Sequence, residues 1–193
     1  MENIILKRFK ESVEVKTRFL KDNLPKLLDM IKLISHAFEA GNKLFLFGNG
    51  GSAADAQHLA AEFVNRYVMD RPPLPAIALT TDTSILTSIS NDFSFNEIFA
   101  KQLKALGKEG DVAFGISTSG NSSNIIKAFE VAKEMRMKIV ALTGNDGGAI
   151  AKMADISLIV PSTSTPRIQE VHILVGHILC EMVEHSLFFK VSP

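Results

Sequence analysis

The chain has 193 residues, 46% of them hydrophobic, and its 21 basic and 21 acidic residues give a net charge of zero at pH 7. This length supports one domain with a substantial core, and the balanced charge, without any block of like sign, argues against a nucleic-acid partner. The only cysteine, Cys180, excludes an internal disulfide, and we expect it in the core.

The charged N-terminal residues lack the apolar stretch of a secretion signal, and we expect no membrane-spanning segment. A cytoplasmic location is therefore predicted. The first 40 residues predict two amphipathic helices, 2–22 and 25–40, with Pro25 suited to the first turn of the second helix. We expect the chain to divide into helices at 1–40, which serve oligomerisation, and a main domain at 41–193.

After residue 41, short and almost wholly apolar runs alternate with helical patterns. Such runs indicate strands that are covered on both faces, and their alternation with helices indicates a parallel sheet. The fold class expected is α/β, a three-layer, doubly wound domain with a five-stranded parallel sheet and an N-terminal helical extension. Strands are expected at 43–48, 74–80, 111–117, 138–144 and 156–161, and helices at 52–66, 82–90, 94–106, 121–136, 147–153 and 167–189.

The first glycine-rich turn, Gly48 to Ser52, follows a predicted strand and opens a helix. Such a turn can hold an anion or a polyhydroxy ligand, although its glycine spacing matches the dinucleotide-binding motif poorly. The helix that follows carries one polar stripe, made of Asp55, His58, Glu62 and Arg66. A solvated face is the simpler explanation, but His58 and Glu62, four residues apart, could also share a metal ion or act as an acid–base pair.

A second turn, 117–124, combines serine, threonine, asparagine and glycine between a predicted strand and a helix. One residue would suffice to cap the helix, so the surplus of hydroxyl groups favours phosphate binding. A third turn follows the strand at 138–144. The carboxyl ends of parallel strands meet at one edge of a sheet, and we expect these three turns to share one crevice.

The last predicted helix is apolar all round over 171–180, more than a domain of this size can cover, so we expect subunit contacts there. Within it, Gln169 and His177 lie two turns apart on nearly the same face. A hydrogen-bonded structural role is more common than a ligand role for a histidine on such a helix, and it is the default for the glutamine. Four other residues have local explanations: a helix cap for Asp82, a turn or hydroxyl recognition for Asn91 and Asp92, and a structural role for His172.

Taken together, these stretches resemble the sugar isomerase (SIS) domain, a flavodoxin-like fold, and within it the sedoheptulose 7-phosphate isomerase family. The resemblance covers essentially the whole chain, through GNGGSAADAQHLAAEFVNR, LPAIALTTDTS, SNDFSFNEIFAKQ, GDVAFGISTSGNSSNI, ALTGNDGG and RIQEVHILVGHILCEMVE. It implies an aldose–ketose isomerase that forms D-glycero-D-manno-heptose 7-phosphate, towards nucleotide-activated heptose for lipopolysaccharide core or other surface glycans. It also implies a homotetramer with one Zn²⁺ per subunit and with active sites at subunit interfaces.

The resemblance further implies residue roles. The phosphate would be held by Ser117, Thr118, Ser119 and Ser122, and zinc by His58, Glu62, Gln169 and His177. Glu62 and His177 would also transfer protons around an enediolate. The rest of the substrate would be bound by Asn49, Gly50, Gly51, Ser52, Arg66, Asn91 and Asp92, together with Glu62 and Gln169.

Two other functions stay open at this point. A non-catalytic SIS protein that binds a phosphosugar or a partner, such as a replication initiator, would share the fold and the serine-rich turn. The presence of His58, Glu62 and His177 argues against it. An isomerase of another phosphosugar is opposed only by the length of the motif match, because a fold alone does not fix a substrate.

Overall fold

The computed structural model describes residues 1–189, so the last four residues of the predicted domain 41–193 lie outside the described part. The α/β class is confirmed, and the strands and helices lie within a few residues of their predicted positions. In chain order the elements are α1 (Glu2–Glu39), β1 (Leu44–Gly48), α2 (Gly51–Val64), β2 (Ala76–Ala78), α3 (Thr83–Asp92), the 3₁₀ turn η1 (Phe95–Glu97), α4 (Ile98–Leu106), β3 (Val112–Ser117), α5 (Ser123–Glu134), β4 (Lys138–Gly144), α6 (Gly148–Met153), β5 (Ile156–Val160) and α7 (Thr165–Phe188).

The five strands form one parallel sheet in the order β2-β1-β3-β4-β5. The direction of winding reverses between β1 and β3, where Gly48 pairs with Ile116 at the carboxyl ends. In a doubly wound sheet, a ligand crevice opens at this reversal. The turns after β1 and β3 are therefore the place to look for a site.

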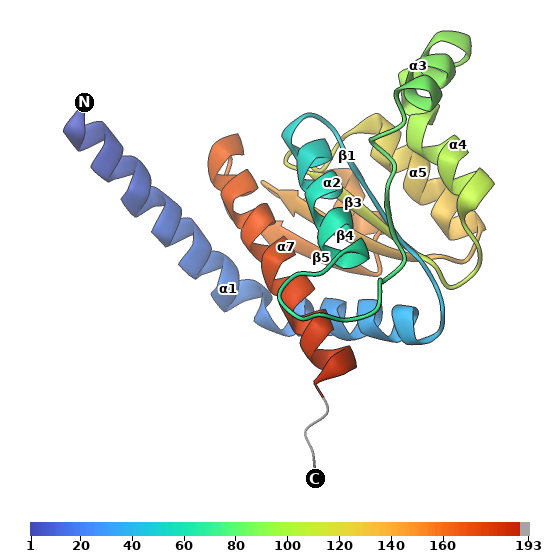
Figure 1. The fold of residues 1–193 in the computed structure, drawn as a ribbon. Coiled ribbons are helices and arrows are strands. Elements are labelled where there is room, and N and C mark those ends of the chain that lie inside the picture. The colour runs from blue at the N-terminus through green and yellow to red at the C-terminus, as the bar shows by residue number, and fades with distance from the viewer. Residues whose placement is uncertain (190–193) are drawn as a thin grey trace.

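Alternate residues of each strand supply two separate cores. Leu44 and Leu46 of β1 pack with α1, α2 and α7, whereas Phe45 and Phe47 pack with α4, α5 and α6. All four side chains are fully buried, as expected for a strand covered on both faces. The result is the predicted three-layer arrangement, with helices on both sides of the sheet (Figure 1).

The N-terminal segment forms one helix, α1, so the prediction of two helices was wrong. Proline inside a helix removes a hydrogen bond and bends the axis, and α1 contains Pro25 and changes direction along its length (Figure 1). Packing on both sides of the bend keeps the helix continuous. Asn23 bonds through its side chain to the backbone of Ile159, and Met30 and Ile34 are fully buried.

Helix α7 is long and apolar enough, by length and composition alone, to cross a membrane. A core helix of a soluble protein meets the same two criteria, and α7 packs against α1, α2 and β4. Only 44% of its most apolar window is buried within the single chain, which fits the expected subunit contacts. Cys180 is fully buried, as predicted, and burial raises the pKa of its thiol.

His172 ties α7 to the sheet, which confirms its structural role. Its Nε2 donates to the carbonyl oxygen of Thr143 at 3.1 Å, because a carbonyl can only accept, and its buried Nδ1 has no partner. Burial lowers the pKa of His172 from 6.5 to about 4, despite the opposing hydrogen bond to Thr143. The imidazole is therefore neutral in the folded protein near pH 7.

We predict that His172 makes the folded state sensitive to acid. The unfolded chain binds a proton at His172 below pH 6.5, whereas the folded protein resists protonation until about pH 4. The stability contributed by the neutral ring is thus complete above pH 6.5 and is lost as the pH falls, by at most about 3 kcal/mol. Chemical unfolding from pH 7 to pH 4 should show a steeper loss for the natural chain than for His172→Gln. Equal slopes in the two proteins would contradict the prediction.

Candidate active site

The turn after β1 brings the chain close to the neighbouring strand. A side chain at Gly48 would lie 2.8 Å from the carbonyl oxygen of Ile116, so only glycine fits there. Gly50 has a positive φ of 57° and begins α2. The N–H groups of Ser52 and Ala53 donate within this turn, to the carbonyl oxygens of Asn49 and Gly50.

Asn49 lies in this turn, but its amide already has a partner. It exchanges two hydrogen bonds with Asn124 of α5, at 2.9 and 2.8 Å. Asn49 can still use its second N–H and a lone pair, so the pair orients the amide that was expected to bind substrate hydroxyls. Asn124 is buried and was not singled out from the sequence, where it is one more small polar residue in the second turn.

The serine-rich turn after β3 gathers hydroxyl groups at the start of the 12-residue helix α5. The Oγ atom of Ser117 lies 3.0 Å from that of Ser122 and 3.5 Å from that of Ser119. Ser122 occupies the N-cap position without making a side-chain capping bond, so capping does not account for its hydroxyl. The hydroxyl groups of the cluster can therefore donate hydrogen bonds to a phosphate at the positive end of the helix dipole.

Two loops interlock to hold the serine-rich turn. Gly120 has a positive φ of 67° and packs so closely on the backbone of Gly147 that a side chain would overlap it. Asn121 accepts a hydrogen bond from the N–H of Ala149, and Asn145 donates one to the carbonyl of Thr118. The third glycine turn predicted from the sequence thus buttresses the second.

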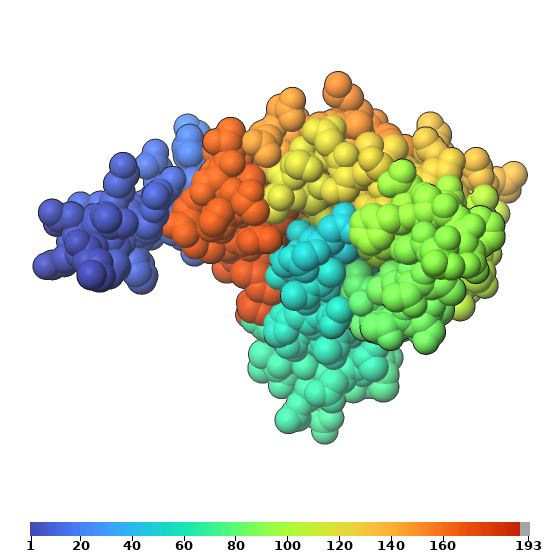
Figure 2. Space-filling model, turned by 90° about the horizontal axis from the view of Figure 1, so that it is seen from above, coloured from blue at the N-terminus to red at the C-terminus, as the bar shows by residue number. Residues whose placement is uncertain are grey.

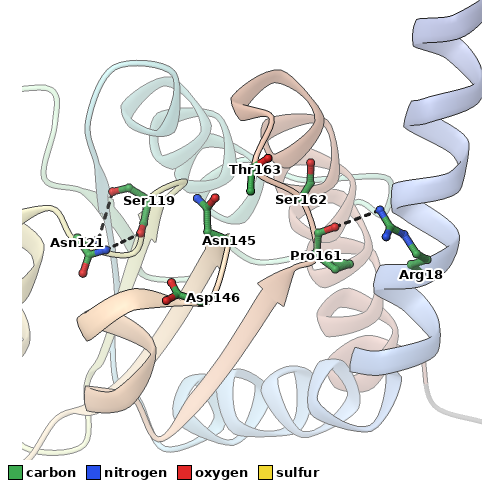
Figure 3. Close-up of a pocket in the computed structure, with 8 residues that line it drawn as sticks. All are labelled: Arg18, Ser119, Asn121, Asn145, Asp146, Pro161, Ser162 and Thr163. Atoms are coloured by element: carbon green, nitrogen blue, oxygen red, sulfur yellow. Dashed lines mark hydrogen bonds between the residues drawn. The ribbon is translucent and has the colours of Figure 1, made fainter.

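A pocket of about 880 Å³ lies beyond the serine-rich turn, at the carboxyl ends of β4 and β5. Figure 3 shows its lining, in which Arg18 from α1 donates to the carbonyl oxygen of Pro161 at 3.2 Å. It is lined by Arg18, Ser119, Asn121, Asn145, Asp146, Pro161, Ser162 and Thr163. It shares only Ser119 with the predicted site residues, so size alone does not identify the site.

Helices α2 and α7 cross at Gly176, and they lie side by side in Figures 1 and 2. A side chain at Gly176 would lie 2.6 Å from Leu59, so glycine permits the close approach. The next residue of α7, His177, meets His58 of α2 with 3.0 Å between their Nε2 atoms. Glu62 has its Oε1 atom 3.6 Å from Nε2 of His58. Three of the predicted residues are therefore in one cluster.

Gln169 also reaches α2, but at its other end. Its amide nitrogen lies where a side chain of Gly51 would be, so Gly51 makes room for it. Eight residues separate Gln169 from His177, which is about 12 Å along the helix axis. The two side chains can serve one ligand only if both extend along α7 towards each other.

The donor types of this cluster suit a zinc ion, which binds imidazole nitrogen and carboxylate oxygen. The two facing nitrogens lie slightly closer than the roughly 3.4 Å between two ligands of a tetrahedral zinc ion. Within residues 1–189, however, no group of three or more histidine, cysteine, aspartate or glutamate side chains is placed so that it could hold a metal ion. The histidine pair thus fits zinc, whereas Glu62 and Gln169 would have to turn towards it.

Asp55 and Tyr67 adjoin the histidine pair. Burial raises the pKa of Asp55, whereas nearby charge on His58 and His177 lowers it, and its buried Oδ2 atom has no hydrogen-bond partner. The ring centroid of Tyr67 lies 5.9 Å from that of His177. Asp55 belongs to the polar stripe seen in the sequence, but nothing in the sequence indicated that Tyr67 packs on a histidine 110 residues later.

The other predicted residues are not brought to this cluster within one chain. Arg66 is exposed and lies beyond Val64, where α2 ends, so the polar stripe does not reach it. Asn91 and Asp92 are exposed residues at the end of α3, rather than part of a turn. Their side chains bond to each other, with Nδ2 of Asn91 donating to Asp92 at 2.9 Å. Ser52 is buried at the start of α2.

Comparison with known proteins gives one consistent result. The family model for the SIS domain matches residues 8–144. The phosphoheptose isomerase of Thermodesulfovibrio yellowstonii is 52% identical over 188 residues, which cover 97% of this chain and 94% of that protein. The structure of a phosphoheptose isomerase from Neisseria gonorrhoeae superimposes with a TM-score of 0.90 at 45% identity, covering 95% of this chain and 98% of that one. A phosphoheptose isomerase from Francisella tularensis gives a TM-score of 0.92 at 41% identity, covering 95% and 97%.

Proposed function

The chain belongs to the SIS domain family, as a phosphoheptose isomerase, and we propose that it interconverts sedoheptulose 7-phosphate and D-glycero-D-manno-heptose 7-phosphate at the crevice between β1, β3 and the α2–α7 crossing. The observation that carries the assignment of the site is the meeting of His58 and His177, with Glu62 beside them. The hydroxyl-rich turn lies at the carboxyl end of β3, and the proposed acid–base cluster lies along the contact of α2 with α7 on one face of the sheet. A phosphorylated sugar needs both.

The phosphate end of the substrate would lie at the serine-rich turn. Hydroxyl groups of Ser117, Ser119 and Ser122 and the N-terminal N–H groups of α5 would supply hydrogen-bond donors there. Thr118 and the first turn, at Asn49 to Ser52, would bind the phosphate and the sugar hydroxyls next to it. The sugar would extend from this cradle towards α2 and α7.

The reaction moves two protons. A base removes a proton from C1 of the ketose, a proton passes from O1 to O2 along the enediolate, and the same base returns a proton to C2. Glu62 would be the carboxylate that acts on the carbon atoms, and His177 would be the imidazole that acts on the oxygen atoms. Each group ends the cycle in its starting protonation state, so the isomerisation needs no redox partner.

Zinc is the cofactor we propose, one ion per subunit, held by His58, Glu62, Gln169 and His177. Because a lone pair bound to zinc cannot accept a proton, Glu62 and His177 would alternate between metal binding and proton transfer. When bound, the zinc ion would supply Lewis-acid stabilisation of negative charge on the substrate oxygens. The support is the pair of imidazole nitrogens that face each other across two helices. Arg66 would then add positive charge near the substrate.

We propose a homotetramer for the assembled enzyme, in which residues 1–40 join subunits. The first half of α1 projects from the body of the molecule (Figure 2), and more than half of the surface is exposed at Ile4, Ile5, Leu6, Phe9 and Val13. Asn91 and Asp92 do not join the histidine cluster of their own chain, and in such an assembly they would reach the site of a neighbouring subunit. We further propose that the enzyme acts in the cytoplasm, towards heptose for lipopolysaccharide or other surface glycans.

Glu62→Gln should lower kcat by about 100-fold or more, because loss of a general base typically costs at least that factor. The KM for sedoheptulose 7-phosphate should change much less, since the phosphate cradle is intact. The assay measures the aldose phosphate formed by the purified protein. Glu130→Gln, which removes an exposed carboxylate on α5, should keep the natural rate. A near-normal rate for Glu62→Gln would show that another group moves the proton.

Removal of zinc should abolish turnover, and added Zn²⁺ should restore it. His177→Ala should lose both bound metal and activity, whereas Ser119→Ala should bind substrate more weakly and keep its metal. Elemental analysis of each purified protein, together with the turnover assay, tests both statements. Full turnover in zinc-free protein, or a natural zinc content in His177→Ala, would rule out the proposed metal site.

Sedimentation velocity at micromolar concentration should give about four times the 21.1 kDa mass of the chain. Phe9→Asp should shift the protein towards smaller species, because it places a charge on the exposed apolar face of α1. A natural chain that sediments as a monomer would refute the assembly.

A further inference from the structure

A buried ion pair joins the two helices that carry the proposed catalytic groups. Arg71 follows α2, and its Nε atom lies 2.9 Å from Oε1 of Glu184 on α7, with side chains only 1% and 2% exposed. Glu184 is seven residues after His177, so both lie on the same side of α7, two turns apart. The proposed mechanism gives this buried pair no role.

Arg71 holds the end of α2 through its backbone. Its Nη2 atom donates to the carbonyl oxygen of Glu62 at 2.9 Å, and its Nη1 atom donates to that of Phe63 at 2.7 Å. These carbonyls belong to the last turn of α2, where no intrahelical N–H is available. The guanidinium therefore fixes the very residue whose carboxylate is proposed to move the proton.

Glu184 holds the segment that follows α2. It accepts hydrogen bonds from the N–H groups of Tyr67, Val68 and Met69, at 2.7, 3.1 and 3.1 Å. Burial alone would raise the pKa of Glu184, but these three donors and Arg71 together hold it below its usual value, so the carboxylate stays ionised. The ring of Tyr67, fixed in this way, lies beside His177.

We propose that Arg71 and Glu184 are positioning residues for the isomerisation, which set the placement of Glu62 and Tyr67 relative to His177. The proposal rests on the catalytic roles proposed above for Glu62 and His177. A displacement of about 1 Å at a reacting group can cost about 100-fold in rate. A buried ion pair is in itself a weak source of stability, because desolvation of both charges opposes it, so fixing this geometry is the better explanation of the pair.

The chain offers a matched control in Asp111. This carboxylate is also fully buried, pairs with Lys43 at 3.0 Å, and accepts two backbone N–H bonds, from Lys43 and Lys108. It lies at the amino ends of β1 and β3, and the partners that it bonds, Lys43 and Lys108, belong to neither α2 nor α7. Asp111→Asn therefore removes a comparable buried charge without touching α2 or α7.

The test compares Glu184→Gln with Asp111→Asn at a temperature where both variants are folded, as monitored by circular dichroism. Glu184→Gln should lower kcat by about 10- to 100-fold, as expected for a group that orients a catalytic residue. Its KM should stay within about threefold, because the phosphate cradle is remote. Asp111→Asn should lower the Tm while kcat stays within about twofold of the natural value.

A natural kcat in Glu184→Gln, or an equal loss of kcat in both variants, would overturn the positioning role. If Glu184→Gln does not fold, Arg71→Lys decides, because lysine keeps the charge but loses the planar fork that reaches Glu62 and Phe63. A folded Arg71→Lys with lowered kcat supports the proposal, and one with natural kcat overturns it. Turnover of the natural chain and of Glu62→Gln, measured alongside, reports separately on the proposed function.

Discussion

The close approach of α2 to α7 is the constraint on which the rest of the site depends. Helix separation is set by the side chains at the crossing, and here Gly176 contributes none, so Leu59 packs directly on the backbone of α7. The residues next to this contact, His58 and His177, are thereby brought within 3.0 Å. A wider crossing would leave each histidine as an isolated residue on its own helix.

The site has two parts that the fold builds by different means. The phosphate cradle follows from the topology, because the sheet reverses its winding between β1 and β3 and leaves their turns open to a ligand. The acid–base cluster follows from helix packing on one face of the sheet. Within one chain the acid–base cluster is partly exposed to solvent, since the side chain of His58 is 47% exposed. The proposed assembly would cover it.

Several buried polar side chains bond to the backbone at places where regular structure ends. Arg71 donates hydrogen bonds to carbonyl groups in the last turn of α2. Glu184 accepts hydrogen bonds from N–H groups of the segment after α2. Asp111 accepts them from two loops at the amino ends of the strands. The Asn49–Asn124 pair joins the turn after β1 to the start of α5. Because backbone groups in these places lack partners in a helix or strand, side chains fix loop geometry that propensity alone would leave loose.

The sequence by itself determined the α/β class, the glycine-rich and serine-rich turns after β1 and β3, and the spacing of His58 and Glu62, because apolar runs, turn residues and helical periodicity act over a few neighbouring positions. Only the tertiary structure decided that α1 continues through Pro25, that Asn49 pairs with Asn124, and that Gly176 admits Leu59. The contact between His58 and His177 joins residues 119 positions apart, and that between Arg71 and Glu184 joins residues 113 apart. Local propensity carries no information about such pairs, since they form only when distant helices pack on the same sheet.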